Sequence, residues 1–138
     1  MTRRSGVTLL ELLVVVALIG VLAMAASGRV SRLAAQWGVR QATRAAIGAF
    51  TRARLEAQVS GQRTAVVIAP PYDILVVRQG DTLSHLSTAA LRVALEGSRD
   101  SMAYVGSGLA WGASNLSLVL RRGDAADTVF VSRLGRVR

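Results

Sequence analysis

The 138-residue sequence predicts an α+β protein, in which one long N-terminal α-helix packs on a small antiparallel β-sheet domain. Two observations predict this fold class. No proline occurs before Pro70, so nothing firmly breaks a helix over the first part of the chain. After that point, short runs of valine, isoleucine and leucine alternate with turn residues, a pattern that is typical of antiparallel strands.

The first half of the predicted helix is apolar enough to span a membrane. Between Val7 and Ala26 the only polar side chains are Thr8 and Glu11. The run has 20 residues, and a helix of that length reaches about 30 Å, the thickness of the hydrocarbon layer. Two arginines precede the run. Because positive residues stay on the cytoplasmic side, the N-terminus is expected inside and the domain outside.

Beyond the apolar run, the helical pattern continues to about Ser60 and shows two apolar stripes. Two stripes are consistent with two burials, one on the chain's own sheet and one on neighbouring subunits of a filament. The alternative is a helix buried on most sides of an ordinary core. Gly61 is expected to end the helix as a C-terminal cap. The first stripe contains Val30, Leu33, Trp37, Leu55 and Val59, and the second contains Val39, Ala46, Phe50, Ala53 and Ala57.

After the helix, the sequence predicts an antiparallel sheet of about five strands. Pro70-Pro71, Gly80-Asp81 and Arg121-Arg122-Gly123-Asp124 are expected to form turns between them. The segment from Gly106 to Gly112 is expected to be a loop because it is rich in glycine. The predicted strands cover residues 65–68, 74–77, 91–95, 116–120 and 128–132.

Composition argues against catalysis and favours acidic partners. The chain has 17 arginines, no lysine and eight acidic residues, and its net charge of +9 suits phosphates, anionic lipids or acidic protein surfaces. No cysteine is present, so neither a disulfide nor a Cys-His pair can form. His85 is the only histidine, and a set with Ser84 or Ser87 and Asp81 lacks a nucleophile-elbow pattern. No metal-ligand spacing occurs, so neither an enzyme nor a cofactor is expected.

Glu11 interrupts the apolar run, and three interpretations compete. A secretory signal peptide would be cleaved at Ala23-Met24-Ala25, whereas an uncleaved anchor would keep the whole run. Neither gives Glu11 a role, although a charge at the bilayer centre costs ~2.5–3.5 kcal/mol. The third interpretation is a different processing signal. Alternatively Glu11 snorkels to the cytoplasmic interface, but its short side chain has limited reach.

The stretch Ser5-Gly6-Val7-Thr8-Leu9-Leu10-Glu11-Leu12 resembles the processing site of type IV prepilins and type II secretion pseudopilins. The resemblance implies that a dedicated prepilin peptidase cuts after Gly6 on the cytoplasmic side and methylates Val7. Glu11 is then the fifth mature residue. The resemblance also implies that Glu11 is an assembly residue, paired with the N-terminal amine of a neighbouring subunit or of its own chain. The family usually has phenylalanine at the first mature position, so Val7 departs from its pattern.

Two shorter segments resemble the H-type minor pseudopilin (GspH) and FimT branch of that family. Residues 50–57 resemble its Ala-Arg-x-Glu-Ala helix end, and residues 132–136 resemble its closing strand with Gly-Arg. The resemblance implies a pilin-like fold whose long helix is transmembrane in its first half. It divides the chain into a leader peptide (1–6), a transmembrane and assembly segment (7–28) and an extracytoplasmic, periplasmic domain (29–138).

Five arginines near the C-terminus are candidate DNA-binding residues. They fall on two adjacent strand segments, where they would form a basic patch that binds phosphates. The alternative is a solvated edge strand, whose charges only prevent pairing with the edge of another sheet. Residues 135–138, Gly-Arg-Val-Arg, resemble the Gly-Arg-x-Arg ending of FimT-type minor pilins, which bind DNA during natural transformation. The five candidates are Arg121, Arg122, Arg133, Arg136 and Arg138.

The sequence therefore predicts a minor pilin or pseudopilin subunit of a type IV pilus or a type II secretion pseudopilus, anchored in the inner membrane. Expected partners are other pilin or pseudopilin subunits, prepilin peptidase and the inner membrane. The alternative is a FimT-type DNA-binding minor pilin for natural transformation. A third hypothesis is a Sec-exported or simply anchored protein in which Glu11 is incidental.

We expect the mature protein to begin at Val7, because Gly6 and Glu11 stand in the register of a prepilin processing site. Loss of residues 1–6 together with methylation of the new N-terminus gives one defined mass. Intact mass spectrometry of protein extracted from membranes measures it. A mature start at Ala26 would contradict the prepilin interpretation and would indicate ordinary signal peptidase.

Overall fold

The computed structural model describes residues 8–112 and 115–138 of the chain. These residues form one α-helix, one short 3-10 helix and eight β-strands. The chain divides into two compact units, Met1–Ala34 and Ala35–Arg138. The helix α1 (Leu9–Ser60) begins in the first unit and ends in the second, whereas all strands belong to the second.

Both ends of α1 follow from local hydrogen bonding. The Thr8 hydroxyl oxygen accepts a hydrogen bond from the Glu11 backbone N–H at 3.3 Å, which is how a threonine caps a helix N-terminus. At the other end Gly61 has φ +67°, the left-handed conformation that terminates helices and favours glycine. The helix predicted from Thr8 to about Ser60 is therefore confirmed.

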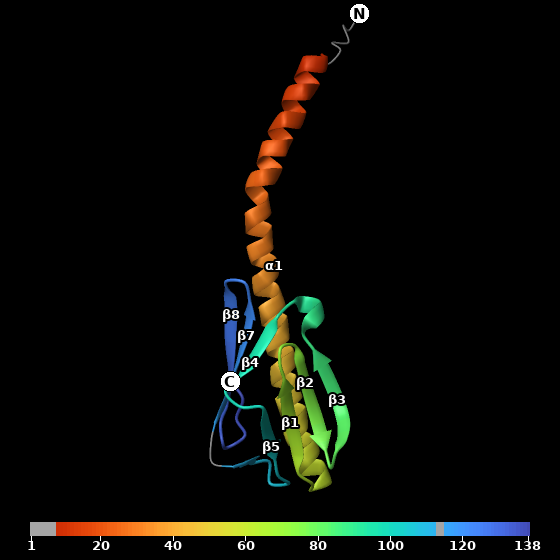
Figure 1. The fold of residues 1–138 in the computed structure, drawn as a ribbon, viewed down its shortest axis with the longest axis vertical. Helices are drawn as coiled ribbons and strands as arrows, with labels where there is room; N and C mark the ends of the chain where they lie inside the picture. The colour runs from red at the N-terminus through yellow and green to blue at the C-terminus, as the bar shows by residue number, and fades with distance from the viewer. Residues whose placement is uncertain (1–7, 113–114) are drawn as a thin grey trace, which may run out of the picture. The chain divides into compact units, whose positions relative to one another are not determined.

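Two antiparallel sheets belong to the second unit (Figure 1). One has the strand order β3-β2-β1-β5-β6 and the other the order β4-β7-β8. Consecutive strands β1, β2 and β3 form a meander, whereas β5 crosses back to pair with β1. The strands are β1 (Thr64–Ala69), β2 (Asp73–Arg78), β3 (Asp81–Ser87), β4 (Ala94–Gly97), β5 (Ser101–Tyr104), β6 (Ala110–Trp111), β7 (Leu116–Arg122) and β8 (Ala125–Val131).

The core lies between α1 and the two sheets. Alternate residues of β1, β2 and β7 are buried, and so are Val129 and Val131 of β8, as the two-residue period of a strand requires. From the helix, Phe50 fills the centre, and small side chains on either side of it let the sheets approach closely. The helix residues in this core are Val39, Ala42, Ala46, Phe50, Ala53 and Ala57.

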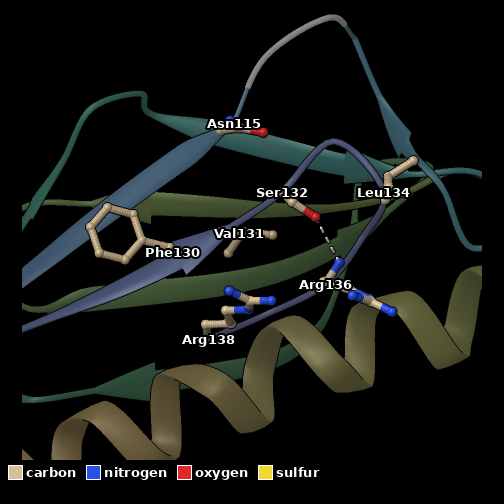
Figure 2. Close-up of a pocket in the computed structure, with 7 residues that line it drawn as sticks. All are labelled: Asn115, Phe130, Val131, Ser132, Leu134, Arg136 and Arg138. Atoms are coloured by element: carbon tan, nitrogen blue, oxygen red, sulfur yellow. Dashed lines mark hydrogen bonds between the residues drawn. The ribbon is translucent and has the colours of Figure 1, made fainter.

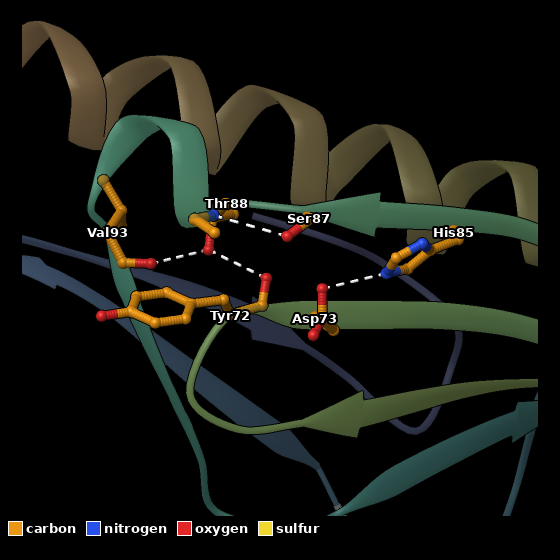
Figure 3. Close-up of polar contacts among 7 residues, drawn as sticks. Tyr72, Asp73, His85, Ser87, Thr88 and Val93 are labelled. Atoms are coloured by element: carbon orange, nitrogen blue, oxygen red, sulfur yellow. Dashed lines mark hydrogen bonds and ion pairs between the residues drawn. The ribbon is translucent and has the colours of Figure 1, made fainter.

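The strand predicted over residues 91–95 is wrong in its first three residues. Leu91 ends a 3-10 helix, η1 (Ala89–Leu91), and Arg92 adopts the left-handed conformation with φ 52°. The cause is the buried side chain of Thr88. Its hydroxyl oxygen lies 3.0 Å from the Tyr72 carbonyl oxygen and 2.6 Å from the Val93 carbonyl oxygen (Figure 3). These contacts hold a tight turn where the chain passes from one sheet to the other, so β4 begins only at residue 94.

The structure describes more strands than the sequence predicted. Three were missed, β3, β5 and β6, and the last of these lies in the segment that was expected to be a loop. The strand β3 was not predicted because its sequence is largely polar, as is possible for a strand at the edge of a sheet. The fold class, a long N-terminal helix packed on antiparallel sheets, is confirmed, although the sheets are two rather than one.

Tyr104 is the largest fully buried side chain of the core. Its hydroxyl has no hydrogen-bond partner among the described residues. Burial raises the pKa of Tyr104 to about 12, and the nearby positive charge of Arg54 offsets only part of this increase. The folded protein therefore keeps the Tyr104 proton at a pH where the unfolded chain releases it.

Because of this difference, we expect the Tyr104→Phe variant to resist alkaline unfolding better than the wild type. The pKa of this tyrosine in the unfolded chain is 10.0. Above that pH the free energy of unfolding of the wild type falls by roughly 1 kcal/mol per pH unit until about pH 12, because only the unfolded chain releases the Tyr104 proton. Urea unfolding of a fragment that begins near Arg29, at about pH 8 and about pH 11, measures the change. Tyr72→Phe, at a partly exposed tyrosine, is the control. An equal alkaline loss in wild type and Tyr104→Phe would contradict the assignment.

Candidate functional site

The processing residues Gly6 and Val7 lie outside the described residues, so the first residue of this candidate site in the structure is Glu11. It is exposed in the first turn of α1, among apolar side chains that are exposed as well. Every leucine, isoleucine, valine and methionine from Leu9 to Met24 is half or more exposed. By length and composition, α1 is the one described helix that is able to cross a membrane. The apolar side chains from Leu9 to Met24 are therefore not buried by other described residues of the same chain.

The two apolar stripes of the helix differ completely in burial. Every residue of the second stripe is buried against the sheets. Every residue of the first stripe is more than half exposed, including Trp37 at 68% and Val59 at 79%. The prediction that one stripe packs on the chain's own domain is confirmed, and the alternative of a helix buried on most sides is wrong. Trp37 is accordingly not a core residue.

Within the second unit, one side of the helix is exposed, and it is here termed the outer face of α1. Its members recur at intervals of three or four residues, so they share one side of the helix, opposite the buried stripe. At its beginning, Trp37, Arg40, Gln41 and Arg44 line a hollow of about 250 Å³. The outer face consists of Trp37, Gln41, Arg44, Gly48, Arg52, Leu55 and Val59.

The last residues of the chain add a short antiparallel segment to the edge of β8. The Phe130 N–H donates to the Arg138 carbonyl oxygen at 2.8 Å, and the Arg138 N–H donates back at 2.9 Å. Val131 faces Val137 next to this bonded pair, and both point inward. Successive side chains of a strand alternate in direction, so Phe130, Arg136 and Arg138 come to one outward face.

That outward face borders a cavity of about 360 Å³ (Figure 2). Phe130 and Leu134 are each 58% exposed beside it, and both arginine side chains are exposed too. An exposed aromatic ring with two guanidinium groups offers a stacking surface and two phosphate contacts in one place. Of the five candidate arginines, the structure brings Arg136 and Arg138 together here.

The loop that carries these arginines is fixed to the end of α1. Arg54 Nη1 donates a hydrogen bond to the Gly135 carbonyl oxygen at 3.2 Å. Gly135 has φ +76°, and a methyl group built on it would lie 2.6 Å from the Gly108 carbonyl oxygen and 3.3 Å from Arg54 Nε. Only glycine fits this position. The two segments that resemble the H-type and FimT branch, one around Arg54 and one around Gly135, therefore contact each other.

The other three candidate arginines do not line this cavity. Arg121 and Arg122 end β7 at the hairpin turn, where Arg122 pairs with Ala125, whereas Phe130 pairs with Ser117 at the opposite end of the hairpin. The Arg122 guanidinium lies over α1, because a methyl group on Gly38 would meet its Nη1 at 2.8 Å. Arg133 is exposed, and its backbone N–H is held by the Asn115 side-chain oxygen at 3.0 Å. The five arginines do not form one patch.

His85 lies on the edge strand β3 and pairs with Asp73 rather than Asp81. Its Nε2 is 2.9 Å from the Asp73 carboxylate, and both side chains are substantially exposed (Figure 3). Hydrogen bonds from His85 and Ser87 lower the pKa of Asp73. An exposed pair of this kind on a sheet edge is a surface interaction. The described residues also contain no cluster of three potential metal ligands.

Sequence reasoning missed Phe130 as a candidate contact residue. The sequence contained the signal. Val129 and Val131 lie on one face of the predicted strand and Phe130 lies on the other, so if the valines are buried, Phe130 has to point outward. It missed the role of Arg54 as well. No local pattern indicates a hydrogen bond between residues 54 and 135, which only the tertiary fold brings together.

Comparisons with known proteins agree with this arrangement. The family model for the prokaryotic N-terminal methylation motif matches residues 1–27. Two crystal structures of the type IV minor pilin FimU of Pseudomonas aeruginosa resemble the chain with TM-scores of 0.63 and 0.61. Each is 11% identical to it and covers 72% of it, over 86% and 90% of FimU.

A second kind of relative has the same fold. The minor pseudopilin EpsH from the type 2 secretion system of Vibrio cholerae resembles the chain with a TM-score of 0.60 and 13% identity, over 72% of this chain and 94% of EpsH. No curated protein sequence matches the chain significantly. The chain therefore carries a prokaryotic N-terminal methylation motif on a pilin-like α+β fold.

Proposed function

We propose that this chain is a minor subunit of a type II secretion pseudopilus or of a type IV pilus. It is inserted in the inner membrane by α1 with its N-terminus in the cytoplasm and its domain in the periplasm. Prepilin peptidase cleaves it after Gly6 and methylates Val7, after which it joins a filament of other pilin-type subunits. The matched methylation motif supports this proposal, and so does the fold shared with FimU and EpsH.

The observation that carries the proposal is the uncovered apolar surface of α1. The helix buries one side against its own sheets, yet its N-terminal part and its outer face remain exposed. Large contiguous apolar surfaces on a protein mark sites of contact with a membrane or with other proteins. A lipid bilayer covers the N-terminal part before assembly, and neighbouring helices cover both parts afterwards.

Glu11 has a specific role in this proposal. A carboxylate enclosed by apolar helices is tolerated only when it is paired, and cleavage after Gly6 creates a positive amine four residues away. Pairing with the amine of a neighbouring subunit then fixes how far one helix is shifted along the next. In the same proposal, the transmembrane and assembly segment ends at residue 28 and the periplasmic domain begins at residue 29.

We expect Glu11→Ala to leave cleavage and membrane insertion intact and to impair assembly. Removal of one partner from a fully buried ion pair costs ~3–5 kcal/mol because the other charge is left unpaired. Co-purification of other methylation-motif subunits from native-host membranes measures this loss. The matched control is Glu96→Ala, which removes an exposed carboxylate from β4. Unchanged co-purification in Glu11→Ala would show that this carboxylate has no partner.

A second candidate function, DNA binding by a FimT-type minor pilin, has one observation in its favour. Arg136, Arg138 and the exposed ring of Phe130 border a single cavity. Guanidinium groups bind phosphates, and an aromatic ring stacks on a base. The rest of the basic surface is dispersed, so this candidate depends on those three side chains.

If this site binds DNA, we expect the double variant Arg136→Ala/Arg138→Ala to weaken binding by a fragment that begins near Arg29. The log–log salt slope should flatten by about 0.9 for each phosphate that an arginine no longer neutralises. Phe130→Ala should weaken binding to single strands more than to duplexes, because stacking contributes ~1–3 kcal/mol per base. Binding titrations at several salt concentrations measure both effects.

The matched control for DNA binding is the double variant Arg40→Ala/Arg44→Ala, which removes the same charge from α1. A basic protein binds nucleic acid non-specifically, so position must make the difference. If Arg40→Ala/Arg44→Ala lowers the affinity for DNA as much as Arg136→Ala/Arg138→Ala does, the binding reflects only the net charge of the protein. The second candidate function is then wrong.

A further inference from the structure

The outer face of α1 has a glycine at its centre that the chain itself does not need. Gly48 lies in the middle of a helix, where glycine costs about 1 kcal/mol relative to alanine. It is exposed, and a methyl group built on it would meet no atom within 4 Å. Glycine at such a position permits another backbone to approach closely. Nothing within the described chain makes that approach.

Arginines stand one turn before and one turn after this glycine. Arg44 and Arg52 are four residues from Gly48 on either side, and both are exposed. Neither forms an ion pair within the described part of the chain. Arg40 is close by but also borders a cavity with Asp124 and Asp127, so it is a less specific probe of the outer face.

The ends of the outer face are apolar. Trp37 is 68% exposed beside its hollow of about 250 Å³, and Leu55 is 59% exposed near the other end. The outer face thus has exposed apolar residues at both ends and two exposed arginines between them, a pattern on which a second helix can pack. The geometry resembles packing in which a small residue sits at the crossing point of two helices.

Charge selects the occupant of this site. Between Glu11 and Glu56 the sequence of α1 has six arginines and no acidic residue. A second copy packed alongside would therefore place arginines against arginines, and like charges brought together at an interface oppose association. A helix with carboxylates spaced two turns apart would instead meet Arg44 and Arg52 together.

We propose that Gly48, flanked by Arg44 and Arg52, is the docking site for the helix of a different pilin-type subunit that carries acidic residues on its facing side. This inference rests on the proposed function and specifies one partner of the assembled filament. The partner's backbone crosses at Gly48, and its carboxylates bind the two arginines. The same site disfavours assembly of this chain with copies of itself.

The test uses the full-length protein in membranes of its native host. Two variants probe the site in different ways, Gly48→Leu by filling the crossing point and Arg44→Glu/Arg52→Glu by reversing its charge. The control is Arg99→Glu/Arg121→Glu, which reverses two exposed arginines far along the chain. A photo-crosslinking amino acid in place of Gln41 identifies the molecule that contacts the outer face.

We expect both site variants to lower co-purification of one methylation-motif subunit about tenfold or more, and the control to leave it unchanged. The crosslinked product should contain a different subunit with acidic residues in its helix, and changing those residues to arginine should restore binding to Arg44→Glu/Arg52→Glu. Gly48→Leu should leave the thermal stability of the chain unchanged or raised, because the position is open.

Three results would overturn the inference. These are wild-type co-purification in both site variants, a crosslink to a second copy of this chain, or a marked loss of thermal stability in Gly48→Leu. If Glu11→Ala impairs assembly while the site variants do not, the docking site is wrong but the proposed function stands. If Glu11→Ala has no effect either, the proposed function fails as well.

Discussion

The packing of one helix face on two sheets determines where the functional surfaces of this protein lie. From Val39 to Ala57 that face is built mainly of alanine around a single large ring, Phe50. Small side chains let the strands approach the helix, and full burial of the phenylalanine contributes ~1.5–3 kcal/mol. Since the buried face is fixed in this way, the opposite side of the helix has to point away from the sheets.

The same helix also positions the C-terminal arginines. Arg54 lies near the end of α1 and donates a hydrogen bond to the Gly135 carbonyl, while the glycine itself fits closely against Gly108. The closing segment then pairs with β8 and turns Arg136 and Arg138 outward beside Phe130. One helix therefore supports two distinct surfaces, an uncovered one on its own outer face, which is apolar at both ends, and a basic one at the end of the chain.

Elements whose pattern is strong and local could be predicted from the sequence. The long helix, its glycine cap and the buried stripe all follow from proline placement and apolar spacing. The strand β3 could not be found in this way, because it lies at an edge and is mostly polar. The segment 91–93 was assigned to a strand by its apolar residues, yet the buried Thr88 hydroxyl and its two carbonyl neighbours impose a turn. The dispersion of the five arginines depends on strand register, which composition does not reveal.

The central claim is that the exposed face of α1 becomes covered when subunits assemble. The natural chain has no cysteine, so a single Leu55→Cys substitution gives one thiol on that face. Its rate of reaction with a water-soluble maleimide is measured in the assembled filament and again after detergent extraction, with Glu96→Cys as the reference. The account predicts that the thiol at position 55 is protected in the filament and reacts freely after extraction, while the reference reacts in both. Equal reaction at position 55 in both states would contradict it.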